Sequence, residues 1–247
     1  MPDRSDLYRF EDFVTDTNRA ADGDALFGLL SRAVGQYGYD RLVFSAPLDF
    51  DLPPALNTHG LYQNYPEDWQ AYYVENDCIR IDPVLLAAAA REHAFTWDEL
   101  EKTSDYSRAQ VRFMRLSEEA GLHHGVGVPL RNRRALIAGI GLASSLEADA
   151  TQPRLDLLNA FCTQFYAAFK RLYARIDEGV VPMVLSAKEK EILTWVAAGK
   201  TDDDIGLILS ISRNTVDTHI RHIFHKLDAP NRVTAVVKGI MGGHIQP

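Results

Sequence analysis

Helix start and stop signals follow one another closely after residue 185, and they constrain the fold more than any other feature of this chain. Ser186 and Glu189 have the spacing of a capping box, in which each side chain satisfies a free backbone N–H group at a helix start. Gly199 stands where the end of that helix needs a left-handed backbone. Further N-cap residues begin three more predicted helices, at Thr201, Ser212 and Asn231. We therefore predict an all-α, four-helix domain over residues 185–247.

Only the turn 210–212 separates the second and third predicted helices, which is the arrangement of a helix-turn-helix unit. One side of the third helix is an apolar stripe made of Val216, Ile220, Ile223 and Leu227. The opposite side carries Asn214, Thr218, Arg221, His222 and His225. Such a helix suits the DNA major groove, because Arg can read guanine and Asn can read adenine. A four-helix structural appendage with a solvated polar face is the alternative that this geometry leaves open.

The N-terminal end of a recognition helix usually faces the bases. We therefore expect base contacts from Asn214, Asp217, Thr218 and Arg221, and phosphate contacts from Arg213 and Lys226. The repeat of His219, His222 and His225 raises the question of a metal site. No Cys or carboxylate stands at a matching position of the helix, and the spacing is not that of a zinc-binding helix motif, so no metal is expected.

The distribution of charge indicates how the C-terminal domain can bind DNA. The chain carries a net charge of −8, but residues 184–247 alone carry +1 and residues 1–183 carry −9. A nearly neutral domain binds DNA weakly on its own, which favours a homodimer. No run of apolar residues is long enough for a membrane span, the first residues have no signal-peptide pattern, and only two cysteines occur. These features predict a reduced, cytoplasmic protein without a membrane partner.

The N-terminal part alternates helical and strand patterns. Two helices are predicted within the first 36 residues, further helices over 66–76, 104–120 and 151–177, and strands over 41–46, 125–131 and 135–144 with a hairpin turn at 131–134. Gly179 and Pro182 mark a linker. We therefore predict an α+β protein: an α/β/α sandwich with a central antiparallel sheet over residues 1–176, a linker over 177–184, and the helical domain over 185–247.

The C-terminal domain resembles the LuxR-type, or GerE-like, helix-turn-helix over its whole length. The matching residues are Leu185–Leu193, Ala198–Thr201, Ile205, Ile211–Ser212, Asn214–Val216, His219, Lys226–Leu227 and Arg232. The resemblance implies base contacts at Asp217, Thr218 and Arg221. Asp217 is a departure, because relatives often carry a cation at this position. Its carboxylate would repel phosphate but can accept a hydrogen bond from a cytosine amine.

The N-terminal part resembles the acyl-homoserine lactone sensor of quorum-sensing regulators, in order and spacing, over roughly residues 35–145. The matching residues are Asn64–Trp69, Tyr73, Asp82–Pro83, Phe95–Trp97 and Gly121–Pro129. The resemblance implies a ligand made of an apolar tail, an amide and a small polar lactone. A pocket for it needs an apolar tube with a few convergent polar groups.

The resemblance also implies a role for each matching side chain. Trp69 would donate its indole N–H to the lactone carbonyl, Asp82 would accept from the ligand's amide N–H, and Tyr65 would donate to the acyl carbonyl, with Tyr73 and Trp97 as flat walls. Gly141 lies where several relatives carry a Ser or Thr hydroxyl. Its lack of a side chain leaves Tyr65 as the sole donor to the acyl carbonyl, or leaves room for a branched or aromatic acyl group.

Structural explanations exist for the same residues. Trp69, Tyr73 and Trp97 can be core aromatics, and Asp82 followed by Pro83 can be a turn or a helix start. An Asp among apolar neighbours nevertheless needs a partner, and both roles can hold at one residue.

Together these patterns predict a homodimeric transcription regulator of quorum sensing. It would bind a palindromic operator in double-stranded DNA under the control of an acyl-homoserine lactone autoinducer, with no cofactor. An orphan regulator that responds to another small molecule, or to none, is the alternative. We expect no enzyme, because the chain has no G-x-S-x-G motif, no P-loop and no Cys with a convincing His partner.

Overall fold

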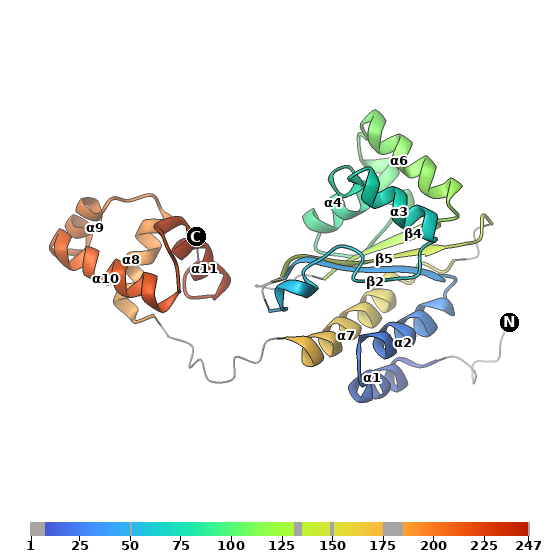
Figure 1. Ribbon diagram of the computed structural model, residues 1–247, viewed down its shortest axis with the longest axis horizontal. Coiled ribbons are helices and arrows are strands. Elements are labelled where there is room, and N and C mark those ends of the chain that lie inside the picture. The colour runs from blue at the N-terminus through green and yellow to red at the C-terminus, as the bar shows by residue number, and fades with distance from the viewer. Residues whose placement is uncertain (1–7, 50, 131–134, 149–150, 175–184, 247) are drawn as a thin grey trace. The chain divides into compact units, whose positions relative to one another are not determined.

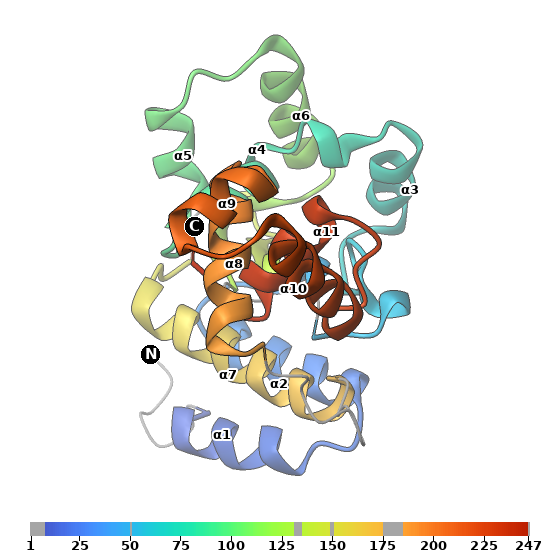
Figure 2. The same ribbon diagram turned by 90° about the vertical axis from the view of Figure 1, so that its left-hand side faces the viewer.

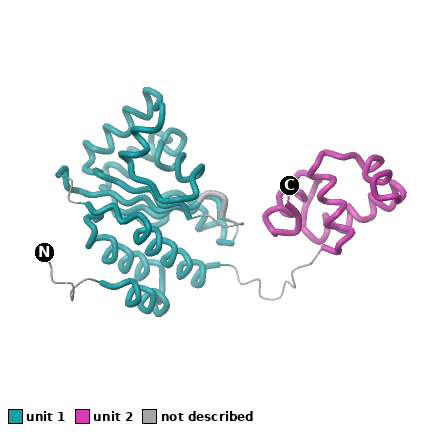
Figure 3. The backbone as a smooth tube through the Cα atoms, turned by 180° about the vertical axis from the view of Figure 1, so that it is seen from behind, with its two compact units in different colours: residues 1–175 teal, residues 176–247 magenta. Residues whose placement is uncertain are grey.

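The computed structural model describes residues 8–49, 51–130, 135–148, 151–174 and 185–246. The chain divides into two compact units, residues 1–175 and 176–247 (Figure 3). The predicted linker, 177–184, and the predicted hairpin turn, 131–134, lie outside the described residues. Within the described ranges, no helix is long and apolar enough to cross a membrane.

A five-stranded antiparallel sheet forms the centre of the larger unit, in the order β2-β1-β5-β4-β3. The three longer strands, which the sequence predicted, are β1 (Arg41–Asp49), β4 (His123–Pro129) and β5 (Ala135–Ser144). The edge strands β2 (Tyr62–Gln63) and β3 (Phe95–Thr96) have two residues each. Strands this short show no alternation of apolar and polar residues, so the sequence analysis did not find them.

The helices α2 (Gly23–Gly35) and α7 (Leu155–Tyr173) cover one face of this sheet, and α1 (Phe10–Arg19) packs on these two helices on the side away from the sheet (Figure 1). Phe165 and Phe169 of α7 pack on Phe44 of β1, with ring centroids 5.1 and 5.0 Å apart. These T-shaped contacts anchor α7 to the centre of the sheet. The helix predicted over 151–177 begins later, at Leu155, and residues 151–154 have no helical structure.

Four helices cover the other face: α3 (Glu67–Glu75), α4 (Pro83–Ala90), α5 (Trp97–Thr103) and α6 (Arg108–Glu119) (Figures 1 and 2). Short 3-10 helices η1 (Pro54–Leu56) and η2 (Cys78–Arg80) precede α3 and α4. The predicted α/β/α sandwich is therefore confirmed. The sequence analysis missed α4, which has no polar residue to give a helical period, and α5, which has only seven residues. It also placed the start of α6 too early, because Ser107 forms a capping box with Gln110.

The smaller unit contains the helices α8 (Ala187–Ala197), α9 (Asp202–Leu209), α10 (Arg213–Lys226) and α11 (Arg232–Met241). Each of the four predicted caps accepts a hydrogen bond from the backbone N–H three residues ahead, as Ser186 does from Glu189 at 3.2 Å. The predicted stripe of α10 faces the core of this unit, with Val216, Ile220 and Ile223 buried. The predicted all-α helix-turn-helix unit is therefore confirmed.

We expect Gly206→Ala to lower the free energy of unfolding of the smaller unit by about 1–3 kcal/mol. A Cβ atom at Gly206 would lie 2.9 Å from the carbonyl oxygen of Ile211, in the turn between α9 and α10. Denaturant unfolding followed by the fluorescence of Trp195, in α8, would measure the loss. The matched control is Gly28→Ala in α2, where an added Cβ meets nothing within 4 Å. Equal stability of the Gly206 variant and the wild type would contradict the expected close packing.

Candidate functional site

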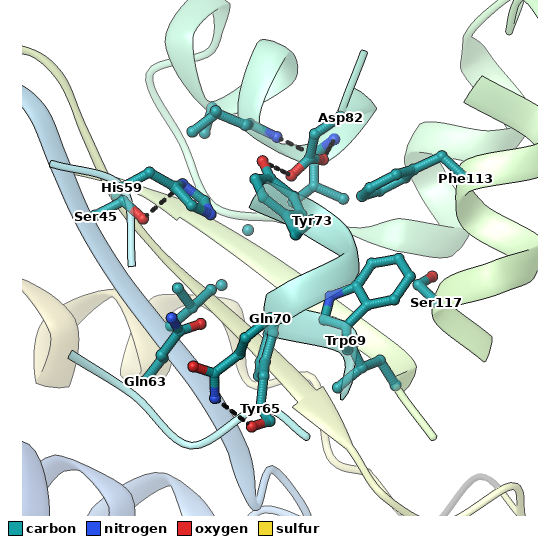
Figure 4. Close-up of a pocket in the computed structure, with 18 of the residues that line it drawn as sticks. Ser45, His59, Gln63, Tyr65, Trp69, Gln70, Tyr73, Asp82, Phe113 and Ser117 are labelled. Atoms are coloured by element: carbon teal, nitrogen blue, oxygen red, sulfur yellow. Dashed lines mark hydrogen bonds between the residues drawn. The ribbon is translucent and has the colours of Figure 1, made fainter. Parts of the chain in front are cut away.

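A pocket lies in the larger unit between the sheet and the helices α3 to α6. All six residues that the sequence analysis selected line it: Tyr65, Trp69, Tyr73, Asp82, Trp97 and Gly141. Figure 4 shows four of them, with Tyr65, Trp69 and Tyr73 on or beside α3 and Asp82 facing Tyr73. The fold thus brings the whole set together from α3, α4, α5 and β5, and their role in binding stays a prediction.

Asp82 is the most constrained polar group of the pocket. It caps α4, because its Oδ1 atom accepts from the N–H groups of Val84 and Leu85 at 2.8 and 3.2 Å. Its Oδ2 atom accepts from the Tyr73 hydroxyl at 3.0 Å. Burial raises the pKa of Asp82, and these three donors oppose that rise. A carboxylate accepts about four hydrogen bonds, so one acceptor position is left on Oδ2.

Aromatic rings form one wall around this carboxylate. Trp69 packs on Phe113 with ring centroids 5.3 Å apart, and Tyr73 packs on Phe113 at 6.0 Å. The rings are buried, so they are core aromatics as well as pocket walls. The indole Nε1 of Trp97 is buried and has no hydrogen-bond partner in the described parts of the chain. An unpartnered buried donor is costly, so this N–H group points to a missing acceptor.

Glycines of the sheet make room for these rings. A Cβ atom at Gly125 would lie 2.0 Å from the nearest atom of Trp97, and one at Gly127 would lie 2.4 Å from the nearest atom of Phe95. A side chain at Gly125 would therefore displace Trp97 from the wall of the pocket, and one at Gly127, which itself lines the pocket, would displace the buried ring of Phe95. The sequence analysis included both glycines in the resemblance but assigned them no function.

Tyr65 and Gly141 are neighbours across the pocket floor. A Cβ atom at Gly141 would lie 3.1 Å from the Tyr65 hydroxyl oxygen and 3.0 Å from Cγ1 of Val43. Gly141 therefore leaves the space that the Tyr65 hydroxyl reaches. Burial raises the pKa of Tyr65 far above its usual value, so this hydroxyl stays protonated and can donate.

The sequence analysis missed several polar residues that line the pocket: Ser45, His59, Gln63, Gln70 and Ser117. His59 stacks on Tyr73 with ring centroids 4.5 Å apart and planes 7° apart. It lies in the segment between β1 and β2, which has no helical or strand period beyond η1. No sequence signal therefore indicated that this histidine enters the pocket.

We expect His59 to make the larger unit less stable in acid. Burial lowers the pKa of His59 from 6.5 to about 4, so between these values the unfolded chain binds more protons than the folded chain. The stability that the neutral imidazole contributes is complete above pH 6.5 and is lost as the pH falls towards 4. Relative to His59→Gln, the wild type should lose up to about 1.4 kcal/mol per pH unit in this window. Urea unfolding followed by Trp69 and Trp97 fluorescence tests this, and parallel curves for the two proteins would contradict it.

The exposed face of α10 carries most of the side chains predicted to contact DNA. Arg213, Asn214, Thr218 and Arg221 are exposed, and Asp217 is half-buried. Arg221 forms an ion pair with Asp217, and Arg213 Nη1 lies 3.5 Å from the Asp203 carboxylate. The Asp217 carboxylate thus holds the Arg221 guanidinium on the exposed side of the helix. Direct contact of these residues with DNA stays a prediction.

Lys226 lies apart from this set. Its Nζ atom donates to Oε2 of Glu189 in α8 at 2.7 Å, and the side chain is largely covered. Glu189 Oε2 also accepts from the Ser186 N–H at 2.6 Å, and these hydrogen bonds lower the pKa of Glu189 despite its burial. Lys226 therefore links α10 to the start of α8. The spacing of residues along α10 does not reveal this contact.

Glu189 also lies beside two of the histidines that the sequence analysis weighed as metal ligands. The ligand atoms of Glu189, His219 and His222 lie within 4.8 Å of one another. This carboxylate comes from another helix, so inspection of α10 alone did not find it. Because Glu189 already binds the Lys226 ammonium, a metal ion would have to compete with a cation that is in place.

The fold and the two sites define a class of protein, in which a helix-turn-helix DNA-binding unit is joined to a unit with a small-molecule pocket. Residues 22–169 match the autoinducer binding domain family, and residues 183–238 match the luxR family of bacterial regulatory proteins. The chain therefore belongs to the LuxR family of quorum-sensing transcriptional regulators.

Individual relatives agree with this assignment. The regulatory protein SdiA of Escherichia coli K12 is 34% identical over 203 residues, which cover 80% of this chain and 79% of SdiA. The quorum-sensing regulator RhlR of Pseudomonas aeruginosa is 28% identical over 221 residues, 87% of each chain. A solved structure of SdiA in complex with octanoyl-rac-glycerol superposes with a TM-score of 0.65 at 25% identity, covering 100% of both chains.

Proposed function

We propose that this chain is a cytoplasmic, homodimeric regulator whose DNA binding is controlled by an acyl-homoserine lactone. The observation that carries the proposal is the remaining acceptor position on Asp82 Oδ2, inside an aromatic pocket with an unpartnered indole donor. The lactone has an amide N–H for this acceptor and carbonyl oxygens for the donors. Tyr65 supplies a second donor beside Gly141.

A second candidate ligand is an acylglycerol, which would make the chain an orphan regulator. The relative SdiA has been solved with octanoyl-rac-glycerol, and this protein has the same fold. A glycerol hydroxyl could donate to Asp82 in place of the amide N–H. The ester carbonyl of the acylglycerol could also accept from Tyr65, so the two ligands differ in whether a hydroxyl or an amide N–H meets Asp82. The lactone is favoured, because residues 22–169 match the autoinducer binding domain family.

We infer that the pocket binds its ligand without a reaction. Ser45 Oγ lies 3.0 Å from His59 Nδ1, which resembles a nucleophile beside a base. The pKa of His59, about 4, makes the imidazole a poor base near pH 7. The pocket-lining residues include no carboxylate hydrogen-bonded to His59, so no acid orients the ring as in a catalytic triad.

The smaller unit supports the dimer. Val233, Val237 and Ile240 are exposed at 74%, 46% and 36%, and they follow one face of α11 at helical spacing. An exposed apolar stripe favours a partner surface, and a second copy offers the same stripe about a two-fold axis. Two recognition helices on such an axis would read a palindromic operator with half-sites about one helical turn apart.

Ligand extraction tests the proposal directly. The protein would be purified from cells supplied with lactones of graded acyl length, denatured, and the released ligand identified by mass spectrometry. We expect one lactone per chain. Recovery of an acylglycerol would support the second candidate instead. Recovery of neither, together with an unfolding midpoint that added lactones do not change, would contradict both.

A further inference from the structure

A group of polar side chains lies on the pocket wall formed by β1 and the segment that follows it. His59 is held there by two contacts, since Nδ1 lies 3.0 Å from Ser45 Oγ and the ring stacks on Tyr73. In Figure 4 the His59 ring lies on the other side of Tyr73 from Phe113. The histidine thus faces a part of the pocket away from the Trp69–Phe113 wall.

The hydrogen bonds around Ser45 determine what His59 offers. Ser45 Oγ accepts from the Gly60 N–H at 3.0 Å, and among the described residues His59 Nδ1 is the one acceptor that its own hydroxyl proton reaches, so we assign that proton to the bond with Nδ1. The neutral ring then carries its proton on Nε2. This atom has no hydrogen bond to any described residue, and the ring lines the pocket. His59 therefore presents a donor to whatever occupies the pocket.

Two glutamine amides add to this wall. Gln70 Nε2 donates to the Tyr65 carbonyl at 2.6 Å, which leaves its Oε1 atom as an acceptor. The Gln63 side chain also lines the pocket and has no hydrogen bond within the described ranges. Under the proposed function, the polar groups of the lactone and the amide are bound by Asp82, Tyr65 and the indole donors of Trp69 and Trp97. A plain alkyl tail would displace water from the polar groups of His59 and Gln63 without forming hydrogen bonds to them, which is unfavourable.

We infer that His59 and Gln63 form a second polar subsite, and that the acyl group of the ligand carries a hydroxyl or carbonyl oxygen that accepts from His59 Nε2–H. Ser45 is a positioning residue, because it sets the proton of the imidazole without reaching the ligand oxygen. The inference rests on the proposed function and specifies the acyl group that the same pocket selects.

The test compares octanoyl-homoserine lactone with a series of octanoyl lactones that carry a hydroxyl or an oxo group. In this series, the substituent stands at successive carbons of the acyl chain. Dissociation constants would be measured on the full chain by quenching of tryptophan fluorescence. The best oxygenated lactone should bind the wild type about tenfold tighter than the plain octanoyl lactone. The dissociation constants show whether the pocket prefers a hydroxyl or an oxo group on the acyl chain, and a preference for either one supports the subsite.

The variant His59→Phe keeps the ring on Tyr73 and removes both nitrogens. It should lose the tenfold preference by weakening only the oxygenated lactone, and His59→Gln, which restores a donor, should recover part of it. Ser45→Ala provides the same test with the imidazole ring retained. His93→Phe, at an exposed histidine, is the matched control and should keep the preference.

The failures of the two ideas are distinguishable. If the wild type binds the plain lactone as tightly as every oxygenated one, or if His59→Phe keeps the preference, the subsite is overturned while the proposed function stands. If no lactone binds the folded wild type at all, the proposed function is overturned and the subsite with it.

Discussion

Asp82→Asn is expected to weaken lactone binding by about 100-fold while leaving the fold intact. The amide oxygen of Asn can still accept from Val84 and Leu85, because Asn is as good a helix cap as Asp. The amide nitrogen takes the place of Oδ2, and the Tyr73 hydroxyl can reverse its hydrogen bond to accept from it. The ligand's N–H would then meet an N–H donor instead of an acceptor. Titration of tryptophan fluorescence with the lactone measures the loss.

Asp98→Asn is the matched control, because it removes an exposed carboxylate at the start of another helix of the same unit. It should bind the lactone like the wild type. Urea unfolding of Asp82→Asn should give a midpoint close to that of the wild type, which separates lost binding from lost structure. Binding by Asp82→Asn within threefold of the wild type would show that Asp82 is a helix cap and nothing more.

Arg221→Ala is expected to weaken binding to the operator by about 100-fold or more. A bidentate contact between arginine and guanine contributes roughly 1–3 kcal/mol, and the proposed dimer loses it in both half-sites. Arg221 is exposed and oriented by its ion pair with Asp217. The operator would be recovered by selection from a random DNA pool, and gel shifts would then compare operator with unrelated DNA. Most of the loss should fall on the operator, because a base contact carries the specificity.

Arg115→Ala is the matched control for this change. Arg115 lies on an exposed face of α6 and forms an ion pair at the same four-residue spacing, with Glu119 at 3.0 Å, but it belongs to the larger unit. Arg115→Ala removes one positive charge, as Arg221→Ala does, and should leave DNA binding unchanged. An equal loss on operator and unrelated DNA would assign Arg221 to the phosphates, and no loss would remove it from the interface.

The helix-turn-helix unit could be predicted almost completely from the sequence because its signals are local. Ser186, Thr201, Ser212 and Asn231 each bond a backbone N–H only three residues away. Such contacts need no tertiary structure, so the sequence shows them directly. The exposed face of α10 follows in the same way from helical spacing.

Elements stabilised by long-range contacts could not be predicted. The helix α4 has no polar face, and the two-residue strand β3 pairs with β4, a neighbour across the sheet. The ion pair between Glu189 and Lys226 joins residues 37 positions apart in sequence. Helical spacing placed Lys226 among the phosphate-contacting residues, whereas the structure directs its ammonium into a contact with another helix.

The residues of the pocket also divide into those that could be selected from the sequence and those that could not. Asp82 and four of the aromatic residues, Tyr65, Trp69, Tyr73 and Trp97, were selected by resemblance, and the fold brings them together, but Phe113 was not selected. The double role considered for Asp82 is partly confirmed, since it does cap α4. His59 and Ser45 could not be selected, because they meet only when the segment after β1 folds back over the sheet. We infer that the acyl group is selected by residues such as these, which the resemblance does not include.

The central claim is that the occupant of the pocket controls the recognition helix. The most direct measurement is the operator affinity of the full-length wild type with and without saturating lactone, beside Asp82→Asn at the same lactone concentration. The account predicts that lactone changes the wild-type affinity by about tenfold or more, in one direction or the other, and leaves the affinity of Asp82→Asn unchanged. Equal operator affinity of the wild type in both conditions, with lactone binding measured in the same samples, would contradict it.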